Sequence, residues 1–170
     1  EYAAELIDDG RDADKLAFRL DAHEYRNLLM TEQPNEDYAV TMGRQFFFDV
    51  YHYFTLKSLT ESSDERIAGI AAKALKEVTY HLRRSSEWVK RFGDGTEESH
   101  RRMQDAVDIL WRFTGELITP DDTDRVMAEA GIGPDTDQLA KDWRGMVNEV
   151  LTQATLTPGA EDAWMYMGGK

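Results

Sequence analysis

The longest stretch of regular hydrophobic spacing covers residues 64–92. Within it proline is absent and glycine occurs once, at Gly69. Its apolar side chains recur every three or four residues, which is the spacing of one face of an α-helix. The stripe runs through Ile67, Ile70, Ala74, Val78, Leu82, Ser85, Trp88 and Phe92. The pattern predicts an amphipathic helix of about seven or eight turns, at roughly 3.6 residues per turn.

Two ionisable side chains accompany this stripe. Glu77 and His81 are four residues apart and share one face of the predicted helix, so we expect both to point toward the core. In the helix predicted over residues 36–60, Asp49 is in register with apolar side chains. A buried ionisable group needs a partner or a function. The sequence therefore predicts a polar cluster of Asp49, Glu77 and His81 inside the protein.

Helical spacing extends over most of the remaining chain. Short connections marked by glycine or proline separate the segments, and we find no strand pattern and no repeat. The predicted helices cover residues 1–7, 12–30, 36–60, 96–118, 121–130 and 134–156. Long helices joined by short loops form antiparallel bundles. We therefore expect an all-α fold with one domain over residues 1–170.

Residues at the predicted helix ends support this division. Ser62 and Glu65 have the spacing of a capping box at the start of the long helix, and Gly93 follows it as a C′ residue. Asn35 and Thr96 are expected to cap the helices that follow them. The last residues, AWMYMGGK, form an apolar and aromatic tail that we expect to be exposed unless a partner covers it.

The charge balance narrows the classes of partner. The formal net charge of −13 disfavours nucleic acids and anionic membranes, because phosphates would be repelled. No apolar run approaches the roughly 20 residues of a membrane span, and we expect a cytoplasmic protein. The absence of cysteine excludes disulfides, zinc–thiolate sites and thiol nucleophiles. One local cluster is basic and could meet an anion or an acidic protein: Arg83, Arg84, Lys90, Arg91, Arg101 and Arg102.

The candidate polar cluster allows two interpretations. Carboxylate-bridged di-metal bundles use about six protein ligands, with Glu-x-x-His on two of the helices. The spacing between Glu77 and His81 is one residue longer than in that motif. Together with Asp49 they make only three candidate ligands that are expected to point inward. Glu97 and His100 match the motif, but they are predicted in a first turn, where an acid complements the helix dipole. The cluster is then either a hydrogen-bonded polar core, such as the remnant of a metal site, or part of a working metal site.

Two long stretches resemble a known family. They are EYRNLLMTEQPNEDYAVTMGRQFFFD at residues 24–49 and SSDERIAGIAAKALKEVTYHLRRSSEWVKRFGDGTEESHRRMQ at residues 62–104. Both resemble the phenylacetate-degradation family of ring-1,2-phenylacetyl-CoA epoxidases, and within it the non-catalytic structural subunits. The resemblance is strong over residues 25–111 and looser elsewhere. The run KALKEVTYHLRRSSEWV followed by GDGTEES is long and specific.

The resemblance implies a ferritin-like fold that is truncated at both ends, without the family's first helices and its last. It also implies a division of labour. A catalytic partner holds the di-iron centre, and the structural subunit scaffolds it with an incomplete ligand set. The complex epoxidises the ring of phenylacetyl-CoA with oxygen and reductase-supplied electrons. For this chain we expect no catalytic residue, no metal and no cofactor, with Asp49, Glu77 and His81 as a vestigial ligand-like cluster. The expected partner is the di-iron subunit, in a homo- or hetero-oligomer.

Two alternatives remain open at this point. The chain could be a di-metal carboxylate oxygenase or oxidase in its own right, using Asp49, Glu77 and His81. It could also be a module that binds a CoA thioester through the basic cluster. Iron content separates the first alternative from a scaffold, and CoA binding by the isolated chain would favour the second.

Overall fold

The computed structural model describes residues 1–160 and 165–168, and within them the chain is helical without a β-strand. The predicted all-α class is confirmed, and the arrangement is that expected of a ferritin-like bundle. The helices are α1 (Tyr2–Ile7), α2 (Ala13–Phe18), the 3-10 turn η1 (Ala22–Glu24), α3 (Leu29–Glu32), α4 (Tyr38–Leu59), α5 (Glu65–Gly93), α6 (Glu97–Trp111), α7 (Gly115–Ile118), α8 (Asp122–Glu129) and α9 (Thr136–Gln153). No helix among the described residues is long and apolar enough to cross a bilayer.

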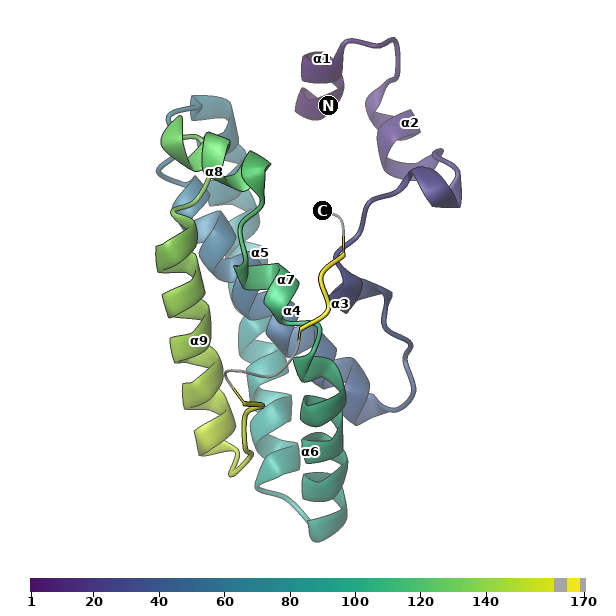
Figure 1. Ribbon diagram of the computed structural model, residues 1–170, viewed down its shortest axis with the longest axis vertical. Coiled ribbons are helices and arrows are strands. Elements are labelled where there is room, and N and C mark those ends of the chain that lie inside the picture. Colours follow the sequence, from purple (N-terminus) through teal and green to yellow (C-terminus); the bar gives the residue numbers. More distant parts are fainter. Residues whose placement is uncertain (161–164, 169–170) are drawn as a thin grey trace.

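Four long helices build the bundle. Figure 1 shows α5, α6 and α9 along the long axis of the molecule, with α4 crossing between them. α4 packs against all three, and α5 also packs against α6 and α9. The short helices α7 and α8 connect α6 to α9, while α1 and α2 lie to one side. α4 is therefore the central element, as its nearly continuous apolar surface predicts.

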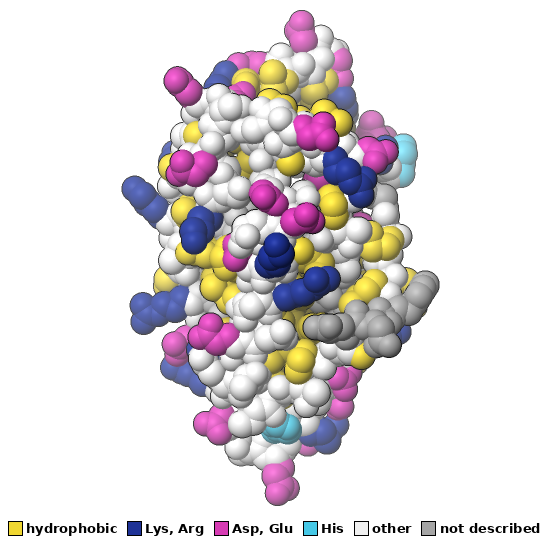
Figure 2. Space-filling view, turned by 60° about the vertical axis from the view of Figure 1, so that its left-hand side comes forward, with side chains coloured by type: hydrophobic (Ala, Val, Ile, Leu, Met, Phe, Trp, Pro, Cys, Tyr) yellow, Lys and Arg dark blue, Asp and Glu magenta, His cyan; other side chains and the backbone are white. Residues whose placement is uncertain are grey.

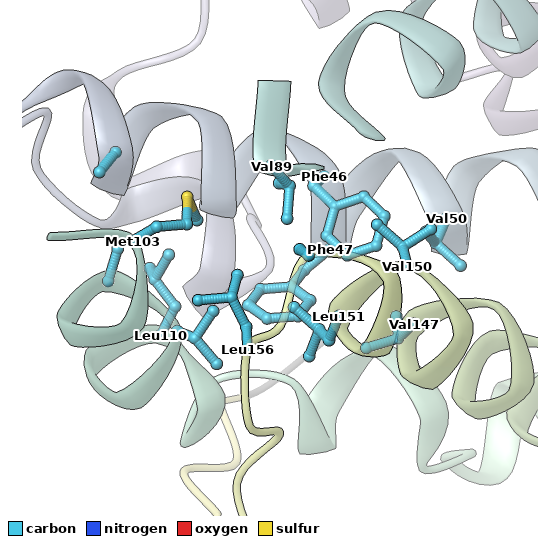
Figure 3. Close-up of a cluster of buried hydrophobic side chains, with 14 of the residues drawn as sticks. Phe46, Phe47, Val50, Val89, Met103, Leu110, Val147, Val150, Leu151 and Leu156 are labelled. Atoms are coloured by element: carbon cyan, nitrogen blue, oxygen red, sulfur yellow. The ribbon is translucent and has the colours of Figure 1, made fainter. Parts of the chain in front are cut away.

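The hydrophobic core lies where α4 meets α6 and α9. Phe46, Phe47 and Val50 of α4 point into it and are fully buried (Figure 3). Trp143 of α9 packs against Phe47 and donates its Nε1–H to the Phe47 carbonyl oxygen at 3.0 Å. Four further aromatic residues of α4 are half-buried around this core: Phe48, Tyr51, Tyr53 and Phe54. The aromatic side chains of this helix therefore do not share one stripe.

Side-chain caps fix the starts of the long helices, but some of the predicted caps are wrong. Asp64 rather than Ser62 caps α5, and it accepts hydrogen bonds from the backbone amides of Arg66 and Ile67. The N-cap lies two residues too late for a Ser62–Glu65 capping box. Likewise Asp37, not Asn35, caps α4. The cap that Thr96 forms on α6 is confirmed.

Gly93 is the last residue of α5 and not the C′ residue that was predicted. Its φ is not positive. A Cβ atom built on Gly93 would lie 2.1 Å from the carbonyl oxygen of Ala154. Glycine is required here because the end of α9 approaches the end of α5, not because the helix needs a left-handed residue.

Two predicted helices are interrupted. Residues 12–30 form α2, a 3-10 turn and the start of α3, because short amphipathic segments need tertiary burial to stay helical. No residue of α2 is buried. The helix predicted to reach residue 118 ends at Trp111, where the Thr114 hydroxyl bonds the Trp111 carbonyl at 2.8 Å. The Arg112 carbonyl accepts the amide of Tyr166 at 2.8 Å, so the break leaves it satisfied.

The described part of the C-terminal tail packs onto this break. The ring of Tyr166 stacks on Phe113 at 5.3 Å, while Met167 remains exposed. The prediction of an uncovered aromatic tail is thus wrong for Tyr166, and Trp164 lies outside the described residues. At the other end of the chain, Tyr2 donates its hydroxyl to Asp64 at 2.6 Å and so fixes α1 to the start of α5.

Charged residues of both signs share the surface. On the face shown in Figure 2, acidic and basic side chains are interspersed, and hydrophobic side chains show between them. The acidic excess of the chain is therefore not gathered into a single patch on this face.

Candidate functional site

The strongest candidate site is a buried carboxylate between α4 and α5. Asp49 leaves only 2% of its surface exposed, although its neighbours along α4, Phe46 and Val50, are apolar. The prediction that Asp49 points inward is confirmed. It faces Ser85 of α5, which is 1% exposed. The site therefore depends on the packing of two helices that are adjacent in sequence and antiparallel.

Both oxygens of Asp49 accept hydrogen bonds. The Ser85 hydroxyl donates to Oδ2 at 2.7 Å, and Gln45 donates its Nε2–H to Oδ1 at 2.6 Å. Ser85 Oγ also lies 3.2 Å from the Leu82 carbonyl oxygen, but a hydroxyl has one proton and the shorter contact is to Asp49. The carboxylate is thus satisfied by neutral donors instead of an ion-pair partner.

Two imidazoles act on this carboxylate. Burial raises the pKa of Asp49 above its ordinary value, and the hydrogen bonds from Ser85 and Gln45 offset part of that rise. His81 and His52 oppose the rise further by their charge. Burial lowers the pKa of half-buried His52, against the attraction of Asp49. Burial therefore opposes the charged form of both the acid and His52, relative to the same groups in water.

The structure corrects the predicted roles of Glu77 and His81. Glu77 is 80% exposed, and its Oε1 lies 3.5 Å from Nε2 of His81, which is itself 41% exposed. The buried stripe of α5 runs through Val78, Leu82 and Ser85. Glu77 is one residue before Val78, and one residue turns the helix by about 100°. Glu77 therefore points away from the core, and the acid–imidazole pair is a surface contact.

The Glu-x-x-His motif formed by Glu97 and His100 lies outside the Asp49 site. His100 of α6 donates from Nδ1 to the Gly93 carbonyl oxygen at 2.7 Å, while Glu97 is exposed in the first turn. His100 thereby satisfies a carbonyl at the C-terminal end of α5. The expected dipole role of Glu97 agrees with its position.

A second buried acid was missed at the level of sequence. Glu116 of α7 is fully buried, and its Oε2 accepts the Leu29 backbone amide at 2.7 Å. Oε1 has no hydrogen-bond partner among the described residues. It lies under the tail, since a Cβ on Gly168 would come within 2.7 Å of it. The only signal in the sequence is one acid inside the short apolar run FTGELI.

The partners of Asp49 were not predicted either. Spacing places Ser85 in the apolar stripe of α5 without assigning it a polar partner, and it does not assign Gln45 to the site. One signal could have paired Ser85 with Asp49. Ser85 is a small hydroxyl residue in an otherwise apolar stripe, and the helix opposite carries a lone acid. Gln45 has a simpler signal, since it lies four residues before Asp49 on the same helix face.

The donor set can be compared with what a di-iron centre needs. Such a centre uses about six ligands, four of them carboxylates. Among the described residues, no group of three or more His, Asp or Glu side chains converges in a way that could hold a metal ion. Asp49 accepts hydrogen bonds from Ser85 and Gln45, and Glu77 faces solvent. The residues that the structure describes do not supply the ligand set of a di-iron centre.

The predicted basic cluster is divided between two helices. Arg101 and Arg102 of α6 both pair with Glu98 of the same helix. Arg83 and Arg84 lie on the exposed side of α5, where they line a shallow hollow with Tyr80 and other residues. The six basic residues therefore do not form one continuous anion site.

Fold and site together define a class: an antiparallel helical bundle of the ferritin type, with a hydrogen-bonded carboxylate buried between two of its helices. Comparison with known proteins identifies the family. The family of phenylacetic acid catabolic proteins matches residues 1–170. One of the subunits of 1,2-phenylacetyl-CoA epoxidase from Escherichia coli (strain K12) is 44% identical over 169 residues, which are 99% of this chain and 68% of that protein. The chain belongs to the phenylacetic acid catabolic protein family.

Proposed function

We propose that this chain is a non-catalytic structural subunit of a ring-1,2-phenylacetyl-CoA epoxidase, which scaffolds the di-iron catalytic subunit of that complex. The complex would epoxidise the ring of phenylacetyl-CoA in aerobic phenylacetate catabolism. The chain itself would contribute no ligand to the iron centre. Its role would be to present a rigid helical surface to its partner.

The hydrogen bonding of Asp49 carries this proposal. Each oxygen of Asp49 accepts a hydrogen bond from a neutral donor, Ser85 or Gln45, and among the described residues no group of three or more His, Asp or Glu side chains gathers to complete a metal site. The surrounding stripe of α5 supplies apolar side chains and not further acids. The similarity to the Escherichia coli epoxidase protein supports the same assignment, because that relative is named as one component of a multi-subunit enzyme.

Co-expression with the cognate catalytic subunit tests the proposal. We expect the two chains to elute together in size-exclusion chromatography. Elemental analysis should find about two iron ions per catalytic subunit and no iron with the isolated chain. The complex should turn over phenylacetyl-CoA, and the isolated chain should not.

A substitution at the buried acid separates scaffolding from catalysis. Asp49→Asn keeps the size of the side chain but changes its donors and acceptors. At equal occupancy of the complex, we expect the single-turnover rate of epoxidation to match that of the wild type. A lower chemical rate with assembly intact would assign Asp49 a catalytic role, and two irons bound to the isolated chain would establish a metalloenzyme instead.

A further inference from the structure

α5 differs in charge from the rest of the chain. Its residues Glu65–Gly93 include seven Lys or Arg and three Glu, whereas the whole chain carries a net charge of −13. One side of α5 packs against α4, α6 and α9. The opposite side is exposed over several turns and carries most of these basic residues. The exposed side of α5 is thus basic, although the molecule as a whole is acidic.

Two arginines of this surface have no charged partner among the residues that the structure places. Arg83 and Arg84 are exposed and form no ion pair or hydrogen bond with any residue that the structure describes. In contrast, Arg66, Arg101 and Arg125 each pair with an acid. The chain has 33 acidic residues. The acid that borders the same hollow, Glu87, lies 4.0 Å from Arg91, so Arg83 and Arg84 are left without an ion pair among the described residues.

Aromatic side chains lie beside these arginines. Tyr80 is 64% exposed, and the guanidinium of Arg91 lies 5.5 Å from the ring centre of Trp88. Together they border a shallow hollow of about 320 Å³ whose lining residues are Tyr80, Arg83, Arg84, Glu87, Trp88 and Arg91. Tyr, Trp and Arg are the residues enriched where protein–protein interfaces concentrate their binding energy.

We propose that this outer surface of α5, defined by the six residues that line the hollow, binds an acidic segment of the catalytic subunit. The inference rests on the proposed function and adds the surface and the chemistry of the contact. Charge complementarity selects an acidic partner, because carboxylates would pair with Arg83 and Arg84. The exposed ring of Tyr80 favours a protein segment over a small anion, since a protein also supplies apolar contact.

The net charge of the chain makes this surface selective. An acidic partner is repelled by most of a molecule with a charge of −13, and it is attracted where the basic residues of α5 gather. Approach is therefore steered to one side of one helix. Interactions of this kind weaken as salt screens them beyond a Debye length of roughly 10 Å at 0.1 M ionic strength.

Charge reversal tests the proposal in the complex of the two full chains. The affinity for the cognate catalytic subunit is measured by calorimetry at low and at high salt for the wild type and for Arg83→Glu/Arg84→Glu. The matched control is Lys141→Glu/Arg144→Glu, which changes the net charge equally on the exposed side of α9. All four positions are exposed, and circular dichroism checks that both variants fold.

We expect the α5 variant to raise the Kd by at least about tenfold and to lose most of the salt dependence. The α9 control should stay within about threefold of the wild type at physiological salt, where only net charge acts. Tyr80→Ala should weaken binding without changing the salt dependence, because it removes apolar contact and no charge.

Other outcomes would overturn the proposal, and they distinguish it from the proposed function. If the α5 variant binds like the wild type, or if both double variants weaken binding equally, the subunit assignment stands but α5 is not the docking surface. If the α5 variant changes only self-association in sedimentation, the occupant is a second copy of this chain. If the wild type does not bind the catalytic subunit, the proposed function fails and the docking surface with it.

Discussion

The two buried sides of α4 differ in how they are held. Toward α6 and α9, Phe46 and Phe47 pack among apolar side chains that need only fill space (Figure 3). Toward α5, Asp49 is buried just as fully but depends on two donors at defined positions. Apolar contact is non-directional, whereas a buried carboxylate is costly wherever one donor is missing. Both sides bury apolar side chains, and the second adds a directional contact that makes the pairing of α4 with α5 specific.

The largest effect is expected on the apolar side. Phe47→Ala should lower the free energy of unfolding by about 3–5 kcal/mol, because it removes a fully buried ring and leaves a cavity beside Trp143. Urea denaturation measures the change. Phe48→Ala, at a half-buried position of the same helix, should cost clearly less. Equal losses for the two variants would contradict the placement of the core.

A smaller effect is expected on the polar side. Ser85→Ala removes the donor to Oδ2 of Asp49 and should destabilise the protein by about 1–3 kcal/mol at neutral pH, because the carboxylate stays buried with one hydrogen bond. Ser86→Ala is the control on the same helix, where no bond to Asp49 is lost. If the two serine variants unfold at the same urea concentration, Ser85 does not hold Asp49 in solution.

The pH dependence of stability sharpens the comparison. Because burial raises the folded-state pKa of Asp49 above its unfolded value, the native protein holds this proton more tightly. The resulting stabilisation is complete below the unfolded pKa of about 3.9 and is lost as the pH rises through the folded-state pKa. Relative to Asp49→Asn, the wild type should therefore lose stability as the pH rises from about 4. Parallel unfolding curves for the two proteins over this range would refute the raised pKa.

The smallest effect is expected at the surface. Glu77→Ala should change the free energy of unfolding by less than about 0.5 kcal/mol, since Glu77 is 80% exposed and its contact with His81 is long. Thermal unfolding at neutral pH provides the measurement. A loss as large as that of Ser85→Ala would place Glu77 in the polar site after all.

Sequence reasoning recovered the long helices better than the short ones. α4, α5 and α9 follow clear apolar spacing and were predicted close to their bounds. The region of residues 12–30 failed because none of its side chains before Leu28 is buried, and packing decides whether such segments become helical. The end of α6 failed because the break at Thr114 is stabilised by Tyr166, which is more than fifty residues away.

The candidate site was predicted in part. Asp49 was found because an acid in register with a dense apolar stripe is unusual. Glu77 was misplaced because it lies at the edge of the stripe of α5, where spacing alone does not tell the buried side from the exposed one. Glu116 was missed because only the fold of α3 and the tail over α7 buries it.

By itself, the sequence determined the helical class, the central position of α4 and the inward direction of Asp49. These follow from local periodicity, which every helix imposes on its own side chains. Only the tertiary structure decided that Ser85 and Gln45 satisfy Asp49, that Glu77 faces water and that Arg83 and Arg84 form no ion pair with any described residue. Those outcomes depend on how one helix is rotated against the next, and a rotation of about 100° for each residue turns a core position into a surface one.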